Sequence, residues 1–434
     1  MLKKPLFSRS GPGFQSTGFL EYGRDAVGEI PVPDKLTLYL RPFAGTQDES
    51  TLRVGDRVRK GQKLKLNDES EDYLIATVTG TISDVTVISG YLGQEQVALS
   101  IERGTEGEGG DPFRAIAKTP SLANALDFMG CLPGAPEFAS LLRRMPYLET
   151  IVIMGIDKDP MVTTNVRVLH DDLESLKGGV EYLRGIASQP RMLLLVPSSL
   201  TVRIGEIGID IEVMEPLYPD TLPPLIAKNL LGKIVPAGKH CEDVGVGFVT
   251  AEAVAAIGKA YKQGKTPADK MVTVIRKDLS KAMVRVRVGT PVKDVLTHLG
   301  LETLHGDRLV LGGPMTGRAA FSEETPVLHD TDAILVQDHK EVVLNPDCHC
   351  VNCGACVRAC PARIPVNMLI RLLENGLWEE AATSYDLLSC VECGLCSYVC
   401  MAHIPIYHYI MLGKVELAGA KSAEESNGER EAAH

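Results

Sequence analysis

The sequence predicts a multidomain chain of α/β and α+β type, and three observations carry that prediction. With 434 residues the chain is too long for one hydrophobic core, so about two to four domains are expected. Its middle alternates strand-like and helix-like apolar patterns, which is typical of α/β folds. Nine of the eleven cysteines lie between Cys348 and Cys400, which indicates a separate C-terminal domain.

Composition and charge exclude several classes of protein. An apolar fraction of 44% is that of an ordinary globular chain. The net charge of −11 argues against a nucleic-acid partner. Since no apolar run approaches the roughly 20 residues of a membrane span, we expect no transmembrane segment. The first ten residues lack the apolar stretch of a signal peptide.

The segment 35–103 is predicted to be all-β, because short β-branched runs alternate with Gly and Asp. Val54–Gln62 followed by Ala76–Ile82 resembles the paired halves of biotinyl and lipoyl domains. We therefore expect a barrel-sandwich hybrid. The tip between the halves, Asn67–Asp72, carries no lysine, so the module is expected to be structural and not a carrier.

The segment 112–262 is predicted to form a Rossmann-like α/β domain. It contains strand-like runs at Ile151–Gly155 and Met192–Val196, separated by a helical pattern at Leu173–Ile186. The loop Gly155–Pro160 lacks the glycine-rich phosphate turn, which argues against a dinucleotide site there.

Residues 270–330 resemble a β-grasp (SLBB-like) module. Two strands are followed by a helix, for which we expect Thr290 as the N-cap and Pro291 as the first helical residue. The expected elements are strands at Met271–Ile275 and Met283–Val288, a helix at 291–299 and a further segment at Leu309–Met315.

Two runs of four cysteines organise the C-terminal part of the chain. Both repeat the C-x2-C-x2-C-x3-C spacing of bacterial two-cluster ferredoxins, in which the fourth cysteine of a run ligates the other cluster. This rule assigns Cys350, Cys353, Cys356 and Cys400 to the first cluster, and Cys390, Cys393, Cys396 and Cys360 to the second cluster.

Zinc and disulfides are the alternatives to iron–sulfur clusters. Zinc sites use pairs of ligands at longer spacing, and two evenly spaced triplets fit that pattern poorly. We therefore expect two [4Fe–4S] clusters in a helix-rich, ferredoxin-like domain over 345–417, with a helical insert at Asn367–Tyr385. Cys131, Cys241 and Cys348 are expected to be buried free thiols.

Thiolate-bound clusters require a reducing environment, so we expect a cytoplasmic protein. The Ala-, Glu-, Lys- and Ser-rich segment 418–434 is expected to be a disordered tail.

These parts, in this order, resemble the RnfC subunit of the Rnf electron-transport complex and the related NqrA subunit of the sodium-pumping Nqr complex. The resemblance runs from about Arg41 to Ala418. It implies a peripheral protein on the inner face of the cell membrane that passes electrons between NADH or ferredoxin and membrane redox subunits. The residues that carry it are Val54–Gln62, Arg287–Val292, Leu311–Gly317, both cysteine runs, Ile404-Pro405 and Lys414.

Two stretches differ from family members that take electrons from NADH. Those members carry a "GxGGAGFP" loop for FMN and an acidic "GAECEP" stretch for the nucleotide. Here Phe128–Phe138 and Met154–Pro160 stand in their places. In the first stretch only Gly130 and Gly134 remain permissive, and two prolines offer no N–H group to a phosphate.

The carboxylates left in these stretches, Glu137 and Asp157, are expected to be solvated surface groups. The second stretch is closer to the Nqr protein, so the chain resembles an Nqr-like middle joined to an Rnf-like cluster domain. The turn Gly312–Met315 either lines a ligand pocket or closes a β-grasp fold.

Two functions are compatible with these features. In the first, the chain is an electron-transfer subunit that relays single electrons through two clusters, from a ferredoxin or cytochrome to membrane subunits. In the second, it is an FMN-containing NADH:ferredoxin-type oxidoreductase subunit with Gly130 and Gly134 at the flavin. We expect the first function, without tight binding of FMN or NADH, because most glycines of the flavin loop are replaced.

Overall fold

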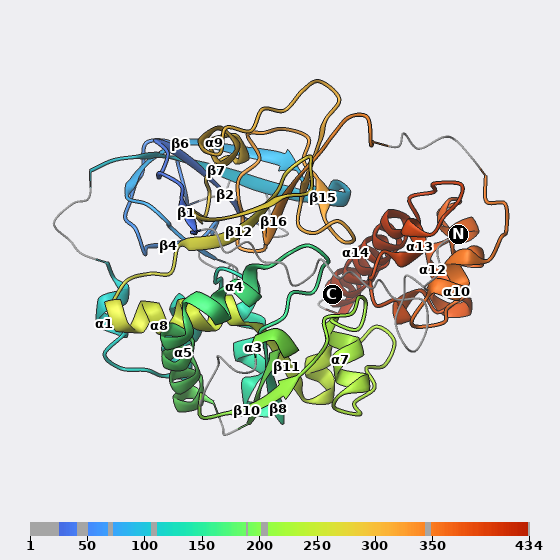
Figure 1. Cartoon of the computed structure of the whole chain (residues 1–434), viewed down its shortest axis with the longest axis horizontal. Coiled ribbons are helices and arrows are strands. Elements are labelled where there is room, and N and C mark those ends of the chain that lie inside the picture. The colour runs from blue at the N-terminus through green and yellow to red at the C-terminus, as the bar shows by residue number, and fades with distance from the viewer. Residues whose placement is uncertain are drawn as a thin grey trace. The chain divides into compact units, whose positions relative to one another are not determined.

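The structure, a computed structural model, describes residues 26–40, 51–67, 73–105, 111–187, 190–200, 207–342 and 349–432. Its described residues fall into two units, which are treated separately below (Figure 1). The large unit lies within Thr17–Pro216 and Gly245–Glu341, and the cysteine unit within Leu217–Val244 and Val342–His434. We call Leu217–Val244 the inserted segment, because it interrupts the sequence of the large unit.

The N-terminal part of the large unit is all-β. An antiparallel sheet has the order β2-β7-β6-β3, and a second, two-stranded sheet pairs β4 with β5. Alternate residues of β2, namely Leu36, Leu38 and Leu40, are buried, as expected for a strand with one face on a core. The strands are β2 (Lys35–Leu40), β3 (Arg57–Val58), β4 (Lys63–Leu64), β5 (Leu74–Ile75), β6 (Gly80–Ser89) and β7 (Glu95–Arg103).

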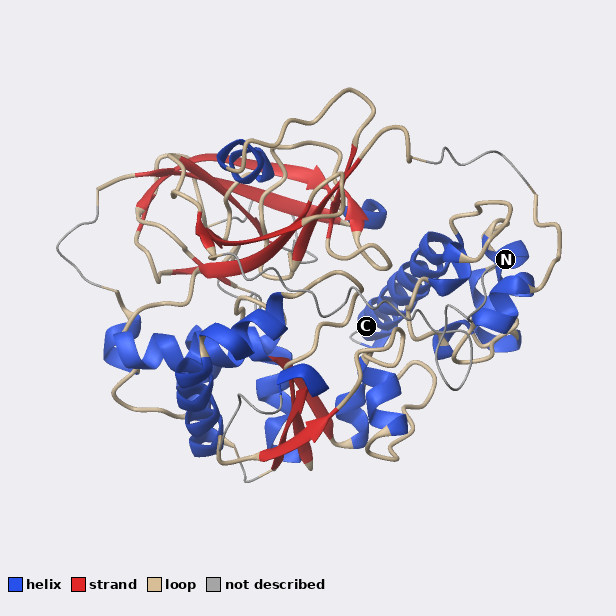
Figure 2. Ribbon diagram, viewed as in Figure 1, coloured by secondary structure: helices blue, strands red, loops and turns tan. Residues whose placement is uncertain are grey.

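The middle of the large unit is a parallel sheet of order β10-β9-β8-β11 with helices packed on it (Figure 2). Helices α5 and α8 approach closely at Gly179 and Gly258, where an added Cβ would meet the backbone of the other helix. The strands are β8 (Thr150–Met154), β9 (Arg191–Val196), β10 (Asp210–Val213) and β11 (Val246–Thr250). The helices are α1 (Phe113–Ile116), α2 (Leu122–Phe128), α3 (Phe138–Arg144), α4 (Thr164–Asp171), α5 (Leu173–Ile186) and α8 (Ala251–Gln263).

A mixed sheet of order β1-β13-β12-β16-β14-β15 completes the large unit. Strands β12 and β16 are parallel, whereas β12 pairs with β13 and β14 pairs with β16 in antiparallel fashion. The strands are β1 (Gly28–Glu29), β12 (Asp269–Ile275), β13 (Lys281–Arg287), β14 (Arg308–Leu311), β15 (Arg318–Ala319) and β16 (Ala333–Gln337), and α9 spans Val292–His298.

The described part of the cysteine unit is helical. A buried apolar stripe on α11, formed by Val366, Leu369, Ile370 and Leu373, has helical spacing and faces the core of the unit. The helices are α7 (Pro223–Asn229, in the inserted segment), α10 (Ala355–Ala359), α11 (Val366–Leu373), α12 (Trp378–Ser384), α13 (Leu395–Tyr398) and α14 (Ile406–Ala432). Among the described helices, none combines the length and hydropathy that a membrane crossing requires.

Most expected elements are confirmed. Strands β8, β9, β12 and β13 and helix α5 lie where the sequence predicts them, and α11 and α12 form the expected helical insert. Segments 68–72 of the hairpin tip and 343–348, which includes Cys348, lie outside the described residues.

Two expectations about helix ends are wrong. The N-cap residue of α9 is Pro291, whose extended backbone starts the helix at Val292, so the hydroxyl of Thr290 makes no cap hydrogen bond. The segment 418–434 is expected to be a disordered tail, yet α14 continues to Ala432. Its Ala, Glu, Lys and Arg residues are strong helix formers that extend an already packed helix.

Candidate functional site

The two cysteine runs share one backbone conformation. In the first run, Asn352 (φ 53°) and Gly354 (φ 70°) are left-handed just before α10. Glu392 (φ 59°) and Gly394 (φ 69°) repeat this conformation just before α13. These left-handed residues bend the chain between successive cysteines, so the first three thiols of each run project from one curved loop.

The repetition continues beyond the fourth cysteine. The N–H of Arg363 donates to the Cys360 carbonyl (3.1 Å), and the N–H of His403 donates to the Cys400 carbonyl (3.1 Å). Both residues are left-handed, and each is followed by an Ile-Pro pair that leads into α11 or α14. The two runs therefore repeat each other in structure. The spacing in the sequence predicted this repetition for the cysteines, but not for the residues that flank them.

The thiols assigned to the second cluster influence one another. Burial raises the pKa of Cys390, Cys393 and Cys396, and Cys360 adds to the rise at each of them. Since such charge effects weaken with distance, Cys360 of the other run is close enough to influence all three thiols.

In the first group, burial raises the pKa of Cys356, and Cys350 and Cys353 contribute to the rise. Cys400 packs against the same apolar core as Cys350 and Cys356.

Among the described residues, the thiols are not gathered as tightly as the ligands of a single zinc ion. None of the ten described cysteines forms a disulfide. Four thiolates on one zinc ion, each about 2.3 Å from it, would lie about 3.8 Å apart. Within the described residues, no three cysteine sulfurs lie within 4.8 Å of one another. A cubane needs a wider set, because each thiolate binds a different iron corner.

The two groups differ in exposure. Cys353 is exposed, and its carbonyl accepts a hydrogen bond from Arg358 Nη1 (3.1 Å). Cys393 is buried, and its carbonyl accepts a hydrogen bond from the hydroxyl of Tyr218, which is itself fully buried. The pKa of the Cys393 thiol is raised to about 12, chiefly by burial, so a metal must displace its proton. Tyr218 comes from the inserted segment, and nothing in the sequence indicated that it contacts the cysteine loop.

Lys414, which carried part of the family resemblance, lies at the second group. Its Nζ donates to the Cys390 carbonyl (2.8 Å) and to Glu392 Oε1 (2.7 Å). The N–H of Glu392 in turn points to Cys390 Sγ (3.4 Å). Burial raises the pKa of Cys390, and Lys414 opposes that rise more strongly than Glu392 adds to it.

In the large unit, the loop that replaces the flavin motif is closed by its own hydrogen bonds. The N–H of Gly130 donates to Tyr73 Oη (2.8 Å), and the N–H of Gly134 donates to the His329 carbonyl (2.7 Å). Leu132 and Ala135 exchange two backbone hydrogen bonds (3.0 and 2.8 Å). These four N–H groups therefore have partners within the protein and are not directed at a phosphate.

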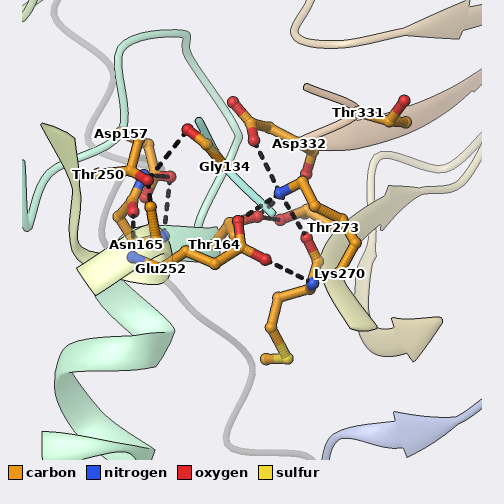
Figure 3. Close-up of polar contacts among 12 residues, drawn as sticks. Gly134, Asp157, Thr164, Asn165, Thr250, Glu252, Lys270, Thr273, Thr331 and Asp332 are labelled. Carbon is orange, nitrogen blue, oxygen red and sulfur yellow. Dashed lines mark hydrogen bonds and ion pairs between the residues drawn. The ribbon is translucent and has the colours of Figure 1, made fainter. Parts of the chain in front are cut away.

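The loop lies at the position where an α/β sheet binds ligands. The order of the parallel strands reverses between β8 and β11, and ligands bind outside the carboxyl ends of strands at such a point. Thr250, the last residue of β11, donates through its hydroxyl to the Gly134 carbonyl (3.1 Å; Figure 3). An added Cβ at Gly134 would meet the side chains of Thr250 and Glu252.

Asp157 is buried, so the expectation of a solvated carboxylate is wrong for this residue. It accepts hydrogen bonds from Asn165 N (2.9 Å), Asn165 Nδ2 (3.1 Å) and Val166 N (3.3 Å) in the first turn of α4. An internal carboxylate thus fills the helix N-terminus that could otherwise bind an anion. Burial raises the pKa of Asp157 to about 6. Glu137, by contrast, is exposed.

Asp159 closes the Gly312–Gly317 turn in the same way. Its carboxylate accepts hydrogen bonds from Met315 N (3.1 Å), Thr316 N (2.8 Å) and Thr316 Oγ1 (2.7 Å). An added Cβ at Gly313 would collide with this carboxylate. Of the two readings of this turn, the closed turn fits the hydrogen bonds.

A buried ion network that the sequence did not indicate joins the parallel and mixed sheets. Lys270 Nζ pairs with Glu252 and with Asp332 Oδ1 (2.9 Å; Figure 3). Burial lowers the pKa of Lys270, but Asp332 and Glu252 outweigh burial and raise it, so the lysine stays charged. Glu252 Oε1 also accepts from Met271 N (2.6 Å), which ties α8 to β12.

Two family models match the chain. Residues 22–106 match the RnfC barrel sandwich hybrid domain, and residues 349–404 match a 4Fe–4S dicluster domain. The chain is thus a multidomain α/β protein with a barrel-sandwich N-terminal domain and an iron–sulfur domain of ferredoxin type, as the sequence predicted for both regions.

Curated relatives agree with these matches. The chain is 28% identical over 355 residues to the C subunit of the ion-translocating oxidoreductase complex of Serratia proteamaculans, covering 76% of this chain and 50% of the relative. For the same subunit of Pectobacterium carotovorum the identity is 27%, with 78% and 48% covered. Together, the domain models and the relatives support the RnfC family for this chain, which spans about half the length of these relatives.

One solved structure with partial similarity is an NAD+-reducing [NiFe]-hydrogenase in the H2-reduced state. The TM-score is 0.45 at 14% identity, with 71% of this chain and 62% of that chain covered.

Proposed function

We propose that the chain is a peripheral electron-transfer subunit of an Rnf-type membrane redox complex and relays single electrons through two [4Fe–4S] clusters. The observation that carries this proposal is the duplicated cysteine loop. The electrostatic effect of Cys360 on the thiols of the other run supports it. Bound cubanes supply one-electron chemistry. The ligand sets are Cys350, Cys353, Cys356 and Cys400 for the first cluster, and Cys390, Cys393, Cys396 and Cys360 for the second.

The protein around the thiols favours electron transfer over catalysis on a bound substrate. Cys393 and Cys396 are buried, and the inserted segment covers the second loop through Tyr218 and through the N–H of Gly238, which donates to the Leu388 carbonyl (3.2 Å). This covering limits the access of water to the buried part of the second set, Cys393 and Cys396. The exposed Cys353 offers a surface edge through which a partner can exchange electrons.

The relatives are named as subunits of ion-translocating complexes, which supports membrane subunits as partners. A cytoplasmic position on the inner face of the membrane would give access to soluble carriers. We propose a ferredoxin or a cytochrome as the soluble partner, and surface contacts as the attachment to the membrane subunits.

The competing function is an FMN-containing subunit that accepts hydride from NADH. It requires backbone N–H groups of the Gly130–Pro136 loop to face a phosphate. The N–H groups of Gly130 and Gly134 donate within the protein instead, and Asp157 and Asp159 fill the neighbouring anion positions. We therefore propose that neither FMN nor NADH binds tightly.

We also propose the finer domain assignments. The order β10-β9-β8-β11 supports a Rossmann-like domain over 112–262. The order β13-β12-β16-β14, with its two central strands parallel, supports a β-grasp (SLBB-like) module over 270–330, extended to Gln337 by β16.

Iron and sulfide analysis of anaerobically purified protein tests the cluster count. About eight of each per chain are expected. Cys353→Ala and Cys393→Ala should each remove about half of the iron, whereas Cys131→Ala, in the large unit, should leave both clusters in place. About four iron atoms per chain, or zinc in their place, would contradict the proposal.

A further inference from the structure

The second cysteine set has a cation built against it. Lys414 reaches back from α14, and its Nζ lies 2.8 Å from the Cys390 carbonyl. Its side chain is only 18% exposed. An ammonium with little access to water interacts more strongly with a nearby charge than an exposed one, because the surrounding dielectric constant is lower.

The first set also has a cation near it, but this cation is exposed to water. Arg358 donates to the Cys353 carbonyl from an exposed position, where water and salt screen its charge. In the duplicated loops, the position that corresponds to Lys414 is held by Glu374 at the end of α11, which carries the opposite charge. The two sets therefore differ in the cation that contacts a cysteine carbonyl, which is a largely buried lysine at the second set and an exposed arginine at the first set.

We propose that Lys414 tunes the second cluster, raising the reduction potential of the group held by Cys390, Cys393, Cys396 and Cys360. This inference rests on the proposed two-cluster function. Each reduction adds one electron from a donor and thus one negative charge to the set, with no bond made or broken. The Lys414 ammonium stabilises that added charge, whereas the Glu392 carboxylate, 2.7 Å from Lys414 Nζ, partly offsets it.

In this proposal Lys414 acts through its charge and does not bind iron. Variants that remove or keep the charge therefore test its role. Lys414→Met removes the ammonium but keeps an unbranched side chain. Lys414→Arg keeps the charge. Glu392→Gln removes the opposing carboxylate, and Lys239→Met changes the charge of an exposed lysine in the same unit.

The test is an anaerobic redox titration followed by electron paramagnetic resonance, which reports two one-electron midpoints. Lys414→Met should lower one midpoint by at least a tenfold change in its redox equilibrium, about 59 mV, and leave the other unchanged. Glu392→Gln should shift the same midpoint upward. Lys414→Arg and Lys239→Met should leave both midpoints near their wild-type values.

The inference is overturned if both midpoints stay in place in Lys414→Met, or if both move equally. If Lys414→Met loses its iron, Glu392→Gln decides: an unchanged or lowered midpoint contradicts the proposal. Iron and sulfide content of the wild-type protein distinguishes a failure of the Lys414 proposal from a failure of the two-cluster function. About eight iron atoms with insensitive midpoints refute only the role of Lys414, whereas about four refute the two-cluster function itself.

Discussion

Tyr218 gives the second cysteine loop the hydrogen-bond donor that Arg358 gives to the first. Both donate to the carbonyl of the second cysteine in a run, Cys393 or Cys353, although they come from unrelated parts of the sequence. The tyrosine is fully buried, so no water replaces its hydroxyl when it is removed. The loop of the second set therefore depends on a residue outside the cysteine runs.

Tyr218→Phe keeps the ring and deletes this donor. A buried carbonyl left without its partner costs about 1–3 kcal/mol, so the second loop should open more often. Under chelator challenge, about half of the iron should leave faster than in the wild-type protein, while the other half leaves at the wild-type rate. Tyr147→Phe, at an 82% exposed position, is the control. Uniform acceleration of all iron loss would contradict a local role.

His329 should lower the stability of the large unit as the pH falls. It is buried, and burial lowers its pKa from 6.5 to about 4. Between these pH values the unfolded chain binds a proton that the folded chain does not bind, so this residue's contribution to stability falls as the pH falls. The loss between pH 7 and pH 5 should be about 2 kcal/mol.

Urea unfolding of the wild-type protein and of His329→Gln at both pH values measures this loss. The variant should show about 2 kcal/mol less acid destabilisation than the wild type. The difference between the two proteins is decisive, because Asp157, Asp159 and Glu252, whose pKa values burial raises, act in the opposite direction in both. Identical pH dependence would show that His329 can be protonated in the folded state.

At the scale of elements, the Gly130–Pro136 loop is the part of the large unit whose sequence and structure depart together from a flavin site. Gly134 has a φ of 79° and packs against Thr250 and Glu252, so it serves closure of the loop and not approach of a ligand. Glycine at this position therefore closes the loop, whereas glycines of the flavin motif let the backbone approach a phosphate.

Gly134→Ala tests this use. Both Gly134 and Gly55 have positive φ values, so alanine at either position should cost about 1–2 kcal/mol of backbone strain. Only at Gly134 would the new Cβ also meet other side chains, whereas nothing lies within 4 Å of it at Gly55. Gly134→Ala should therefore lower the free energy of unfolding more than Gly55→Ala. Equal losses would mean that the loop has room around Gly134.

Periodic elements could be predicted from the sequence because their signals are local. Strand β8 and helix α5 follow from apolar runs at their own positions. The cap of α9 could not be predicted correctly, since a proline at the cap moved the helix start away from Thr290. The burial of Asp157 was missed for a related reason: its partners lie on α4, and a lone carboxylate in a sequence does not reveal them.

At the scale of the whole molecule, the chain combines an iron–sulfur domain with a large unit whose candidate ligand positions are filled by its own side chains. The iron–sulfur domain could be predicted because the two cysteine runs have the spacing of two-cluster ferredoxins. Tyr218, Lys270 and the inserted segment could not, because each acts through contacts between residues far apart in sequence. The sequence therefore indicates the redox centre better than the protein that surrounds it.

The central claim is that electrons reach the clusters from another redox protein and not from NADH through a bound flavin. Rapid anaerobic mixing of the oxidised protein with NADH, and separately with a reduced ferredoxin, tests it most directly through the visible absorbance of the clusters. The account predicts rapid bleaching by the ferredoxin and no bleaching by NADH on a catalytic timescale. Rapid bleaching by NADH alone would contradict it, because the closed Gly130–Pro136 loop would then have to open for a flavin.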